Sequence, residues 1–416
     1  MRFVPSQLVL AGSFLVGTIV AKGTNTMDEG NLTRLRPGVP LAPVPLPPAG
    51  PARDGAEILR QLTGLTRAGM NGGGGGGGDG GSRLRFVKKI ELEGDVWEPE
   101  GIVRLTGPGG NDNDNDDDDD EEEERFWVSA GEYTVPTEKF PDGRWVDGTD
   151  RSAGAGFAHF VVFDGRGRRL ADWVVSKEGD AEMLTTPGEN KYHNGGLDYD
   201  GLHIWATLSQ YRPNSTATVV RVDPVDLRVE RVFRVGDHQG GVVHDVETGT
   251  LTTLSWGGRV ARRWDLKRGD GGGGDGGREE EQVRLVLGEG VDGGTGFDVP
   301  EDVMVNPSHW IDYQDCKSLG RVGGRSLALC SGIATLAPGV EVGGLAVVDV
   351  DAGMAPVWEV PFLERTERTT AAEGGGGGVL MTKNPMDVAL VGGRVRLYFA
   401  PEEGRGAVFV YEICEG

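Results

Sequence analysis

The sequence predicts an all-β protein whose folded part is a single β-propeller of five four-stranded blades. Three observations lead to this fold. After residue 82, short β-rich runs alternate with Gly, Asp, Asn and Pro. A three-part pattern then recurs five times along the chain. The fifth repeat ends without a fourth strand, whereas residues 83–92 form an alternating stretch ahead of the first repeat.

The first strand of each repeat joins a Gly or Asp to a short apolar run, and a more apolar second strand follows it. The first strands start near Gly101, Gly196, Gly241, Asp302 and Asp387. The second strands cover residues 126–129, 204–209, 251–256, 327–331 and 395–400. Turn residues separate the two strands of each pair, so we expect antiparallel hairpins.

The third strand of each repeat ends with a bulky apolar residue before an acid, as at Phe163 and Asp164. Residues 132–156 and 307–324 lengthen two of the repeats and are interpreted as inserts. The predicted fourth strands cover residues 170–175, 229–235, 283–287 and 356–361. Residues 83–92 are expected to complete the fifth blade beside residues 407–413, which would cover an open sheet edge. A β-sandwich, the alternative fold, does not explain a pattern that recurs five times.

Composition divides the chain into three parts. Residues 1–21 place one basic residue before an apolar stretch that ends in small residues, the pattern of a secretory signal peptide. Residues 22–82 are rich in Pro and Gly and are expected to form a disordered tether. The propeller is expected over residues 83–416, with low-complexity inserts at 109–124, 269–280 and 371–378. We therefore expect a secreted, extracellular protein.

The net charge of -23 does not indicate a charged functional face. Eleven of the negative charges lie within residues 112–124, a run typical of a solvated loop. No basic face indicates nucleic-acid binding, and past the signal peptide no apolar stretch is long enough to span a membrane. We expect a monomer whose partner is a small molecule or a glycan.

Three cysteines and two glycosylation sequons bear on the secreted state. Cys316 and Cys330 are the expected disulfide, which leaves Cys414 unpaired. The sequons begin at Asn31 and Asn214 and would be usable in a secretory pathway that glycosylates.

Several segments, most of them in the central blades, resemble an uncharacterised family catalogued as domain of unknown function 6454. They are YHNGGLDYDG (192–201), IWATLSQYRPNS (204–215), RVDP (221–224), GGVVHDVETGTLTTLSWG (240–257) and EYTVP (132–136). The similarity extends from about Phe86 to Ile413. The resemblance implies a secreted or surface propeller, and it implies no activity and no catalytic residues.

Polar residues near the starts of the inner strands are the candidate ligand-binding residues, because these strands line the central channel of a propeller. The candidates are Glu100, His193, Asn194, His244, Glu301, Asp302 and Asp387, with Tyr211 and Arg212 from the end of a second strand. The same face is expected to carry Glu98, Glu132, Gln210, His238, Ser255, Asn384 and Glu402. His159 is expected to be an isolated structural residue.

Five of the candidates are interpreted as ligands of a divalent cation, a possible cofactor: Glu100, His193, His244, Glu301 and Asp387. Oxygen and nitrogen donors on separate rigid strands can surround one ion. Glu100 with Gly101 also resembles the metal-binding start of the gluconolactonase-type propellers, although the rest of that family's pattern is absent. The alternative is that these acids and amides only bond turn amides.

Two classes of function remain open, because propellers host both. The first is a propeller that binds a small molecule or glycan in its channel. The second is a metal-assisted hydrolase or lactonase, or a glycoside hydrolase that uses channel carboxylates. Gly-x-Ser-x-Gly, His-Glu-x-x-His and P-loop motifs are absent. Residues 132–156 are expected to form a lid over the same face.

Overall fold

Valine, isoleucine, threonine and aromatic residues favour extended chain, and they fill the strands of this protein. The computed structural model describes residues 54–65, 82–106, 124–146, 148–152, 154–175, 191–224, 229–266, 297–306, 310–337, 339–367 and 378–414. Within these ranges, twenty strands form five four-stranded antiparallel sheets, the five-bladed propeller that the repeat predicts. No helix in the described part of the chain is long and apolar enough to cross a membrane.

Each of the first four blades uses four strands that follow one another along the chain. Blade 1 contains β2 (Glu98–Leu105), β3 (Arg125–Val135), β4 (Ala155–Asp164) and β5 (Arg169–Val174). Blade 2 contains β6 (His193–Tyr199), β7 (Ile204–Ser209), β8 (Ala217–Val222) and β9 (Val229–Val235). Blade 3 contains β10 (Gly241–Asp245), β11 (Thr250–Leu254), β12 (Val260–Asp265) and β13 (Asp302–Val305). Blade 4 contains β14 (Asp312–Val322), β15 (Arg325–Ala337), β16 (Val340–Asp349) and β17 (Ala355–Pro361).

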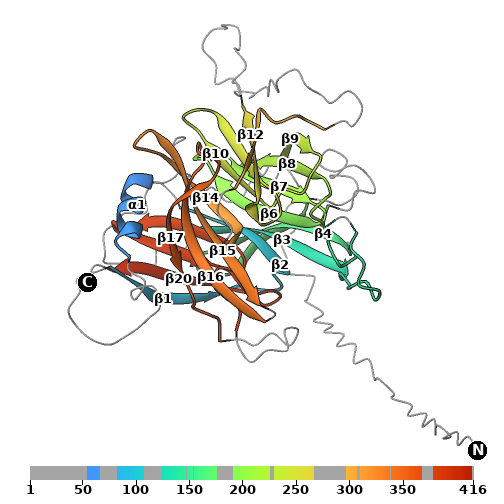
Figure 1. Ribbon diagram of the computed structural model, residues 1–416. Coiled ribbons are helices and arrows are strands. Elements are labelled where there is room, and N and C mark those ends of the chain that lie inside the picture. The colour runs from blue at the N-terminus through green and yellow to red at the C-terminus, as the bar shows by residue number, and fades with distance from the viewer. Residues whose placement is uncertain are drawn as a thin grey trace, which may run out of the picture. The chain divides into compact units, whose positions relative to one another are not determined.

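The fifth blade joins the two ends of the folded chain. It contains β18 (Met386–Val391), β19 (Arg394–Phe399), β20 (Ala407–Cys414) and, as its outer strand, β1 (Arg83–Glu91). Figure 1 shows β1 lying beside β20, and the two strands pair from Arg83 with Cys414 to Glu91 with Ala407. The prediction that residues 83–92 close this blade is confirmed. The inner strands β2, β6, β10, β14 and β18 neighbour one another around the channel.

One boundary between repeats was predicted wrongly. Residues 302–304 were expected to begin blade 4, but they belong to β13, which pairs with β12 as the outer strand of blade 3. The true inner strand of blade 4 is β14, which lies within residues 307–324, the segment interpreted as an insert. Its channel face is polar because it carries Asp315 and Lys317, so it lacks the apolar run of the other inner strands. The predicted strand at residues 283–287 lies outside the described residues.

A short helix packs against the propeller ahead of β1. Helix α1 (Gly55–Thr63) buries Ile58 and Leu62 completely in the apolar core of blades 4 and 5. The Gln61 side chain donates to the carbonyl of Gly393 and accepts from the amide of Val395. Residues 54–65 therefore belong to the folded unit, although we expected the whole of 22–82 to be a tether. Residues 22–53 and 66–81, together with the predicted signal peptide, lie outside the described residues.

A disulfide crosses blade 4 near the channel. Cys316 on β14 and Cys330 on β15 are direct cross-strand partners, and their sulfur atoms are bonded. Both residues are fully buried, whereas Cys414 on β20 is a free thiol. The bond ties the channel-lining strand of blade 4 to its neighbour.

Candidate functional site

Two glutamates project from the start of β2 because of an irregularity in the strand. Glu98 and Glu100 lie on either side of Pro99, where the pairing of β2 with β3 becomes irregular. The register with β3 shifts between Pro99 and Gly101, so Glu100 is the extra residue of a β-bulge. Bulges re-aim side chains next to binding sites. Here the bulge holds two carboxylates at the mouth of the channel.

A histidine from the next blade faces these carboxylates. His193 is the first residue of β6, and glycines allow this strand to approach β2 closely. A β-carbon on Gly101 would lie 2.5 Å from the amide nitrogen of Leu197. A β-carbon on Gly196 would lie 2.3 Å from Oδ1 of Asp315. The glycines that mark the repeats are therefore required by the close packing of the inner strands.

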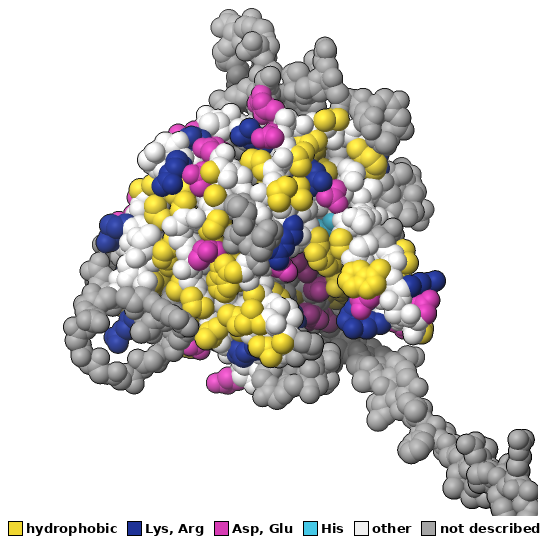
Figure 2. Space-filling view, viewed as in Figure 1, with side chains coloured by type: hydrophobic (Ala, Val, Ile, Leu, Met, Phe, Trp, Pro, Cys, Tyr) yellow, Lys and Arg dark blue, Asp and Glu magenta, His cyan; other side chains and the backbone are white. Residues whose placement is uncertain are grey.

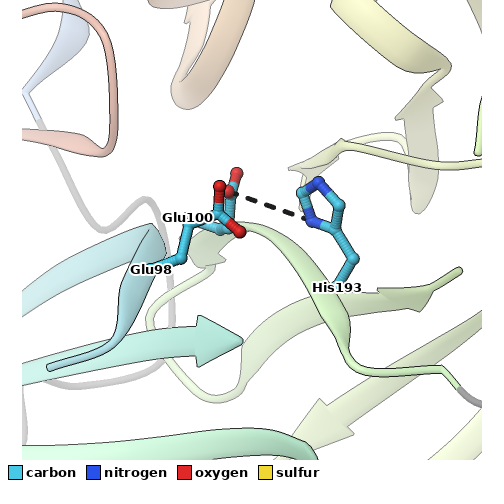
Figure 3. A group of neighbouring side chains, drawn as sticks. All are labelled: Glu98, Glu100 and His193. Carbon is cyan, nitrogen blue, oxygen red and sulfur yellow. Dashed lines mark ion pairs between the residues drawn. The ribbon is translucent and has the colours of Figure 1, made fainter. Parts of the chain in front are cut away.

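Glu98, Glu100 and His193 form a cluster with the geometry of a cation site. Each offers one ligand atom, and these atoms all lie within 4.8 Å of one another. The Nδ1 atom of His193 is 3.9 Å from Oε1 of Glu100 (Figure 3). A cation that holds its ligands at about 2.1 to 2.5 Å can bridge such separations. Figure 2 shows acidic side chains in a hollow on one face of the molecule, with a histidine close by.

The electrostatics of the cluster favour an added positive charge. Burial raises the pKa of Glu98, although the hydrogen bond from the Tyr133 hydroxyl opposes this. Burial raises the pKa of Glu100 well above its ordinary value, and the charges of Glu98, Glu403 and Asp315 add to the effect. The Lys383 ammonium only partly offsets it. A divalent cation would remove the repulsion between the two glutamates.

His193 is neutral, so one of its two ring nitrogens has a lone pair that can bind a cation. Burial lowers its pKa to about 4. Its Nδ1 atom lies 3.1 Å from the carbonyl oxygen of Asn194, so this nitrogen carries the proton and donates it there. Binding of a cation through Nδ1 requires the proton to move to Nε2 and that hydrogen bond to be lost. Cation binding is therefore expected to change the tautomer of His193.

Aromatic rings form one wall of the site. The Tyr211 ring stacks on His193 with centroids 4.8 Å apart, and the Trp256 ring lies 5.2 Å from Tyr211. Tyr133 and Tyr192 form an edge-to-face pair at 5.1 Å on the side of Glu98. Burial and the nearby glutamates raise the pKa of Tyr211 to about 12, so its hydroxyl stays protonated. Such walls suit the apolar faces of an organic ligand.

His238 adds a buried polar group beside this wall. Its ring centroid lies 4.8 Å from Trp256 and 5.4 Å from His193. Burial, with a smaller contribution from the neighbouring His193 imidazole, holds the pKa of His238 well below the ordinary value, so the ring is neutral. Neither ring nitrogen has a hydrogen-bond partner among the described residues. A buried imidazole without partners costs about 1 to 3 kcal/mol, which a bound ligand or water would recover.

A buried ion pair lies deeper in the channel. Lys317 on β14 donates to Asp315 at 2.7 Å and to the carbonyl oxygen of Leu197, and both charged side chains are buried. Burial raises the pKa of Asp315 to about 7 even though Lys317 opposes the shift. The pair ties β14 to β6 across the channel.

Three of the sequence candidates lie elsewhere along the channel. His244 is near the other end of its strand, where Nδ1 contacts Oδ2 of Asp200 at 2.8 Å. Asn194 donates to the carbonyls of Ala130 and His159 and so links blade 2 to blade 1. Asp387 accepts from the backbone amides of Arg104 and Val388 and links blade 5 to blade 1. The five predicted cation ligands therefore do not converge, and of these five only Glu100 and His193 belong to the cluster.

Glu301 and Asp302 lie away from the channel. Both belong to the outer edge of blade 3 beside Arg263, and their side chains are 60% and 48% exposed. Their assignment to the channel followed from the wrong boundary of blade 4. Arg212 lies beside the aromatic wall, where its charge opposes the rise in the pKa of Tyr192.

Some relevant residues carried little signal in the sequence. Asp315 and Lys317 could have been found from an acid and a base two apart, which share one strand face. Trp256 follows β11 within a short 3-10 turn, and no pattern predicted its role. His159 was expected to be isolated, but both of its ring nitrogens contact carboxylates, those of Glu132 and Asp172.

The loop between β3 and β4 is ordered where it is described. Its two arms meet through backbone hydrogen bonds such as Phe140 to Asp150 at 2.8 Å. Gly148 lies against Pro213 of the neighbouring blade, next to the exposed sequon residue Asn214. The tip presents Trp145, which is 71% exposed. Asn31, the other sequon residue, lies outside the described residues.

Fold and site together define a five-bladed β-propeller with an acidic, aromatic-walled cluster at the channel mouth. The chain belongs to the family of unknown function DUF6454, whose sequence pattern matches residues 146–414. The match contains His193, Tyr211 and His238, and it begins after the two glutamates of β2.

Several solved structures are similar to this chain at low identity and with low TM-scores. A luciferin-regenerating enzyme is 8% identical, with a TM-score of 0.37 over 80% of this chain and 95% of its own. A hypothetical protein from Leishmania major is 10% identical, with a TM-score of 0.39 over 78% and 90%. A GH43 β-xylosidase/α-arabinofuranosidase from a compost microbial metagenome is 9% identical, with a TM-score of 0.38 over 79% and 94%. Similarities this distant carry no functional information, and no curated protein matches the sequence.

Proposed function

We propose that the protein binds an extracellular small molecule or glycan at the channel mouth, through a divalent cation held by Glu98, Glu100 and His193. The convergence of these three side chains, with ligand atoms within 4.8 Å of one another, carries the proposal. Two buried carboxylates with raised pKa values need a positive charge, and a neutral imidazole completes the donor set. An imidazole among the donors favours Mn²⁺ or Zn²⁺ over Ca²⁺.

The surroundings support an organic ligand above the cation. Three protein ligands leave coordination positions open for hydroxyl or carbonyl oxygens. Tyr211 and Trp256 offer apolar contact, and His238 offers an unused donor and acceptor. This combination suits a polyhydroxylated molecule, whose oxygens bind the cation while its carbon-bound hydrogens contact the rings.

Cation binding is tested by titrating the chelator-treated protein with Mn²⁺, Zn²⁺ and Ca²⁺. We expect Mn²⁺ or Zn²⁺ at about 100 times its Kd to stabilise the fold by about 2.7 kcal/mol. Glu100→Gln should weaken the affinity at least about tenfold, since it removes a charged ligand. Glu301→Gln is the matched control, because this exposed residue lies on the outer strand of blade 3. Nitrogen chemical shifts of His193 should report the change of tautomer.

Equal stabilisation of the wild type and Glu100→Gln, or none in either, would contradict the proposal. A glycan and metabolite binding screen, run with and without the cation, then identifies the ligand class.

A metal-assisted hydrolase or lactonase is the second candidate. It is favoured by the three-ligand donor set, because catalytic metal sites keep a position open for water. Cation-dependent turnover of lactones or esters that is lost in Glu100→Gln would establish it. A glycoside hydrolase requires carboxyl groups on opposite sides of the scissile bond, whereas Glu98 and Glu100 project together from the start of β2.

The extracellular location is part of the proposal. It is supported by the apolar stretch in residues 1–21 and by a buried disulfide of the kind found in secreted proteins. N-terminal sequencing of the protein recovered from culture medium should find a start near residue 22. Retention of the whole N-terminus inside the cell would contradict it.

A further inference from the structure

A buried histidine with two carboxylate partners lies behind the glutamates of the site. His159 on β4 is 4% exposed. Its Nε2 atom is 3.0 Å from Glu132 and its Nδ1 atom is 2.9 Å from Asp172. A carboxylate only accepts hydrogen bonds, so both ring nitrogens must carry protons. This geometry requires the positively charged imidazolium form.

The ring of His159 holds the residue that precedes Glu98. Trp97 stacks on it with centroids 3.9 Å apart and planes 26° from parallel. The indole also lies against the Arg169 guanidinium, 5.3 Å from the ring centroid, and packs against the apolar core between blades 1 and 5. Trp97 has a φ angle of 49°, a left-handed conformation that is unfavourable for a residue with a side chain. Such a conformation persists only where the surroundings enforce it.

A second path leads from His159 to the same glutamate. Glu132, which accepts from Nε2 of His159, directly precedes Tyr133 on β3. The Tyr133 hydroxyl donates to the Glu98 carboxylate. His159 is therefore linked to Glu98 in two ways. It contacts Trp97, which directly precedes Glu98, and it contacts Glu132, which directly precedes Tyr133.

We propose that the His159 imidazolium is a positioning residue that fixes the Glu98 carboxylate for cation binding. The proposal rests on the cation site described above. When the ring loses a proton, one of its two carboxylate partners loses its imidazole donor. The partner affected is either Glu132, whose side chain is 34% exposed, or Asp172, which keeps its ion pair with Arg169 at 3.3 Å. That carboxylate must then move or take up water, which loosens Trp97 or Tyr133 and with them Glu98.

The charges around His159 determine at which pH this happens. Glu132 comes from β3, Asp172 and Arg169 come from β5, and Glu93 and Asp95 flank Arg169 from the loop before β2. Asn194 from β6 meets only the His159 backbone carbonyl and does not titrate. Burial lowers the pKa of His159, but the hydrogen bonds and charges of Asp172 and Glu132 outweigh it and raise the pKa above the ordinary value. The His159 imidazolium thus positions Glu98 at acidic to neutral pH, and this effect is lost as the pH rises through the raised pKa of His159.

The test compares the Mn²⁺ affinity of the wild type, His159→Gln and His203→Gln across a pH series. His203 is the matched control, because it lies past the opposite end of β6. At low pH we expect His159→Gln to weaken affinity about tenfold, the size of effect typical for residues that orient metal ligands. The ratio of the two Kd values should approach one as the wild-type His159 ring, followed by NMR, loses its proton. His203→Gln should leave the ratio at one throughout.

A ratio that is independent of pH, or equal to one throughout, would overturn the positioning role while leaving the cation site intact. If the wild type binds no cation, the proposed function fails. Crystal structures of the wild type and His159→Gln then test whether His159 positions Glu98. Displacement of Glu98 from the Tyr133 hydroxyl in His159→Gln would support the positioning role. An unchanged Glu98 would overturn it.

Discussion

The two ends of β6 carry clusters of the same residue types, but the pKa of the carboxyl group is raised in one cluster and lowered in the other. At its start, His193 faces Glu98 and Glu100. Just past its end, Asp200 contacts His244 from the neighbouring blade. Both clusters combine acids with a histidine from an adjacent inner strand. They differ in how many donors surround the carboxylate.

Asp200 is fully satisfied by hydrogen bonds. Its Oδ1 atom accepts from the amides of Leu202 and His203 at 2.8 and 2.6 Å. Its Oδ2 atom accepts from Nε1 of Trp205 at 2.7 Å and from Nδ1 of His244 at 2.8 Å. Burial alone would raise the pKa of Asp200, but these donors together hold it at about 2.

Glu100 has the opposite environment, since its neighbours Glu98, Glu403 and Asp315 carry like charges. The difference teaches that a histidine and acids on inner strands do not by themselves indicate a binding site. A cluster that satisfies its own charges stabilises the fold, whereas one that leaves them uncompensated can bind a ligand.

The largest expected effect comes from disturbing the satisfied cluster. Asp200→Asn replaces one acceptor oxygen by an amide that cannot accept, so two of the four donors lose their partner. At about 1 to 3 kcal/mol for each buried unsatisfied donor, we expect a loss of about 3 kcal/mol in the free energy of unfolding. Urea unfolding of the wild type and variant in chelator measures it. A loss below about 1 kcal/mol would mean that the cluster is not the closed network described.

The pH dependence of stability should reveal the same carboxylate. Because the folded-state pKa of Asp200 is about 2, below the ordinary 3.8, its contribution is present above about pH 4 and is lost as the pH falls through 2. The stability difference between the wild type and Asp200→Asn should narrow by about 2 kcal/mol over this window. Unfolding curves at several pH values provide the measurement. A difference that stays constant down to pH 2 would contradict the lowered pKa.

The sequence predicted the fold better than the site because the repeat depends on core packing. Gly101, Gly196 and the apolar runs recur since every blade must bury the same faces, and even the closure by β1 followed from a missing strand. The error in the assignment of the strands, at β14, arose where the channel required the polar residues Asp315 and Lys317 instead of an apolar run. A pattern based on apolar burial cannot detect a strand that buries charged side chains.

The site was only partly predictable, because position near a strand start does not determine direction. Glu100 reaches the cluster through a bulge, and bulges leave no clear mark in a sequence. His244 lies three residues into its strand, which is enough to place it at the other end of the channel. Trp256 was expected to end the second strand 251–256, but β11 ends at Leu254 and the ring comes from the turn that follows, where strand periodicity does not determine its direction.

The smallest and most discriminating expected effect is a gain of stability at the channel mouth. Glu100→Gln keeps the size of the side chain and removes a carboxyl group whose charged form is disfavoured by burial and by neighbouring carboxylates. In chelator, we expect it to stabilise the fold by about 1 kcal/mol, as is common when strain at a functional site is relieved. The same acid-to-amide change thus has opposite signs at the two ends of β6. Urea unfolding with and without Mn²⁺ tests both halves of the argument, since the cation should reverse the order of stability by stabilising the wild type more than the variant. If the variant is less stable than the wild type in chelator, then the Glu100 carboxylate is stabilised by its neighbours, as the Asp200 carboxylate is. The two clusters would then not differ in this way.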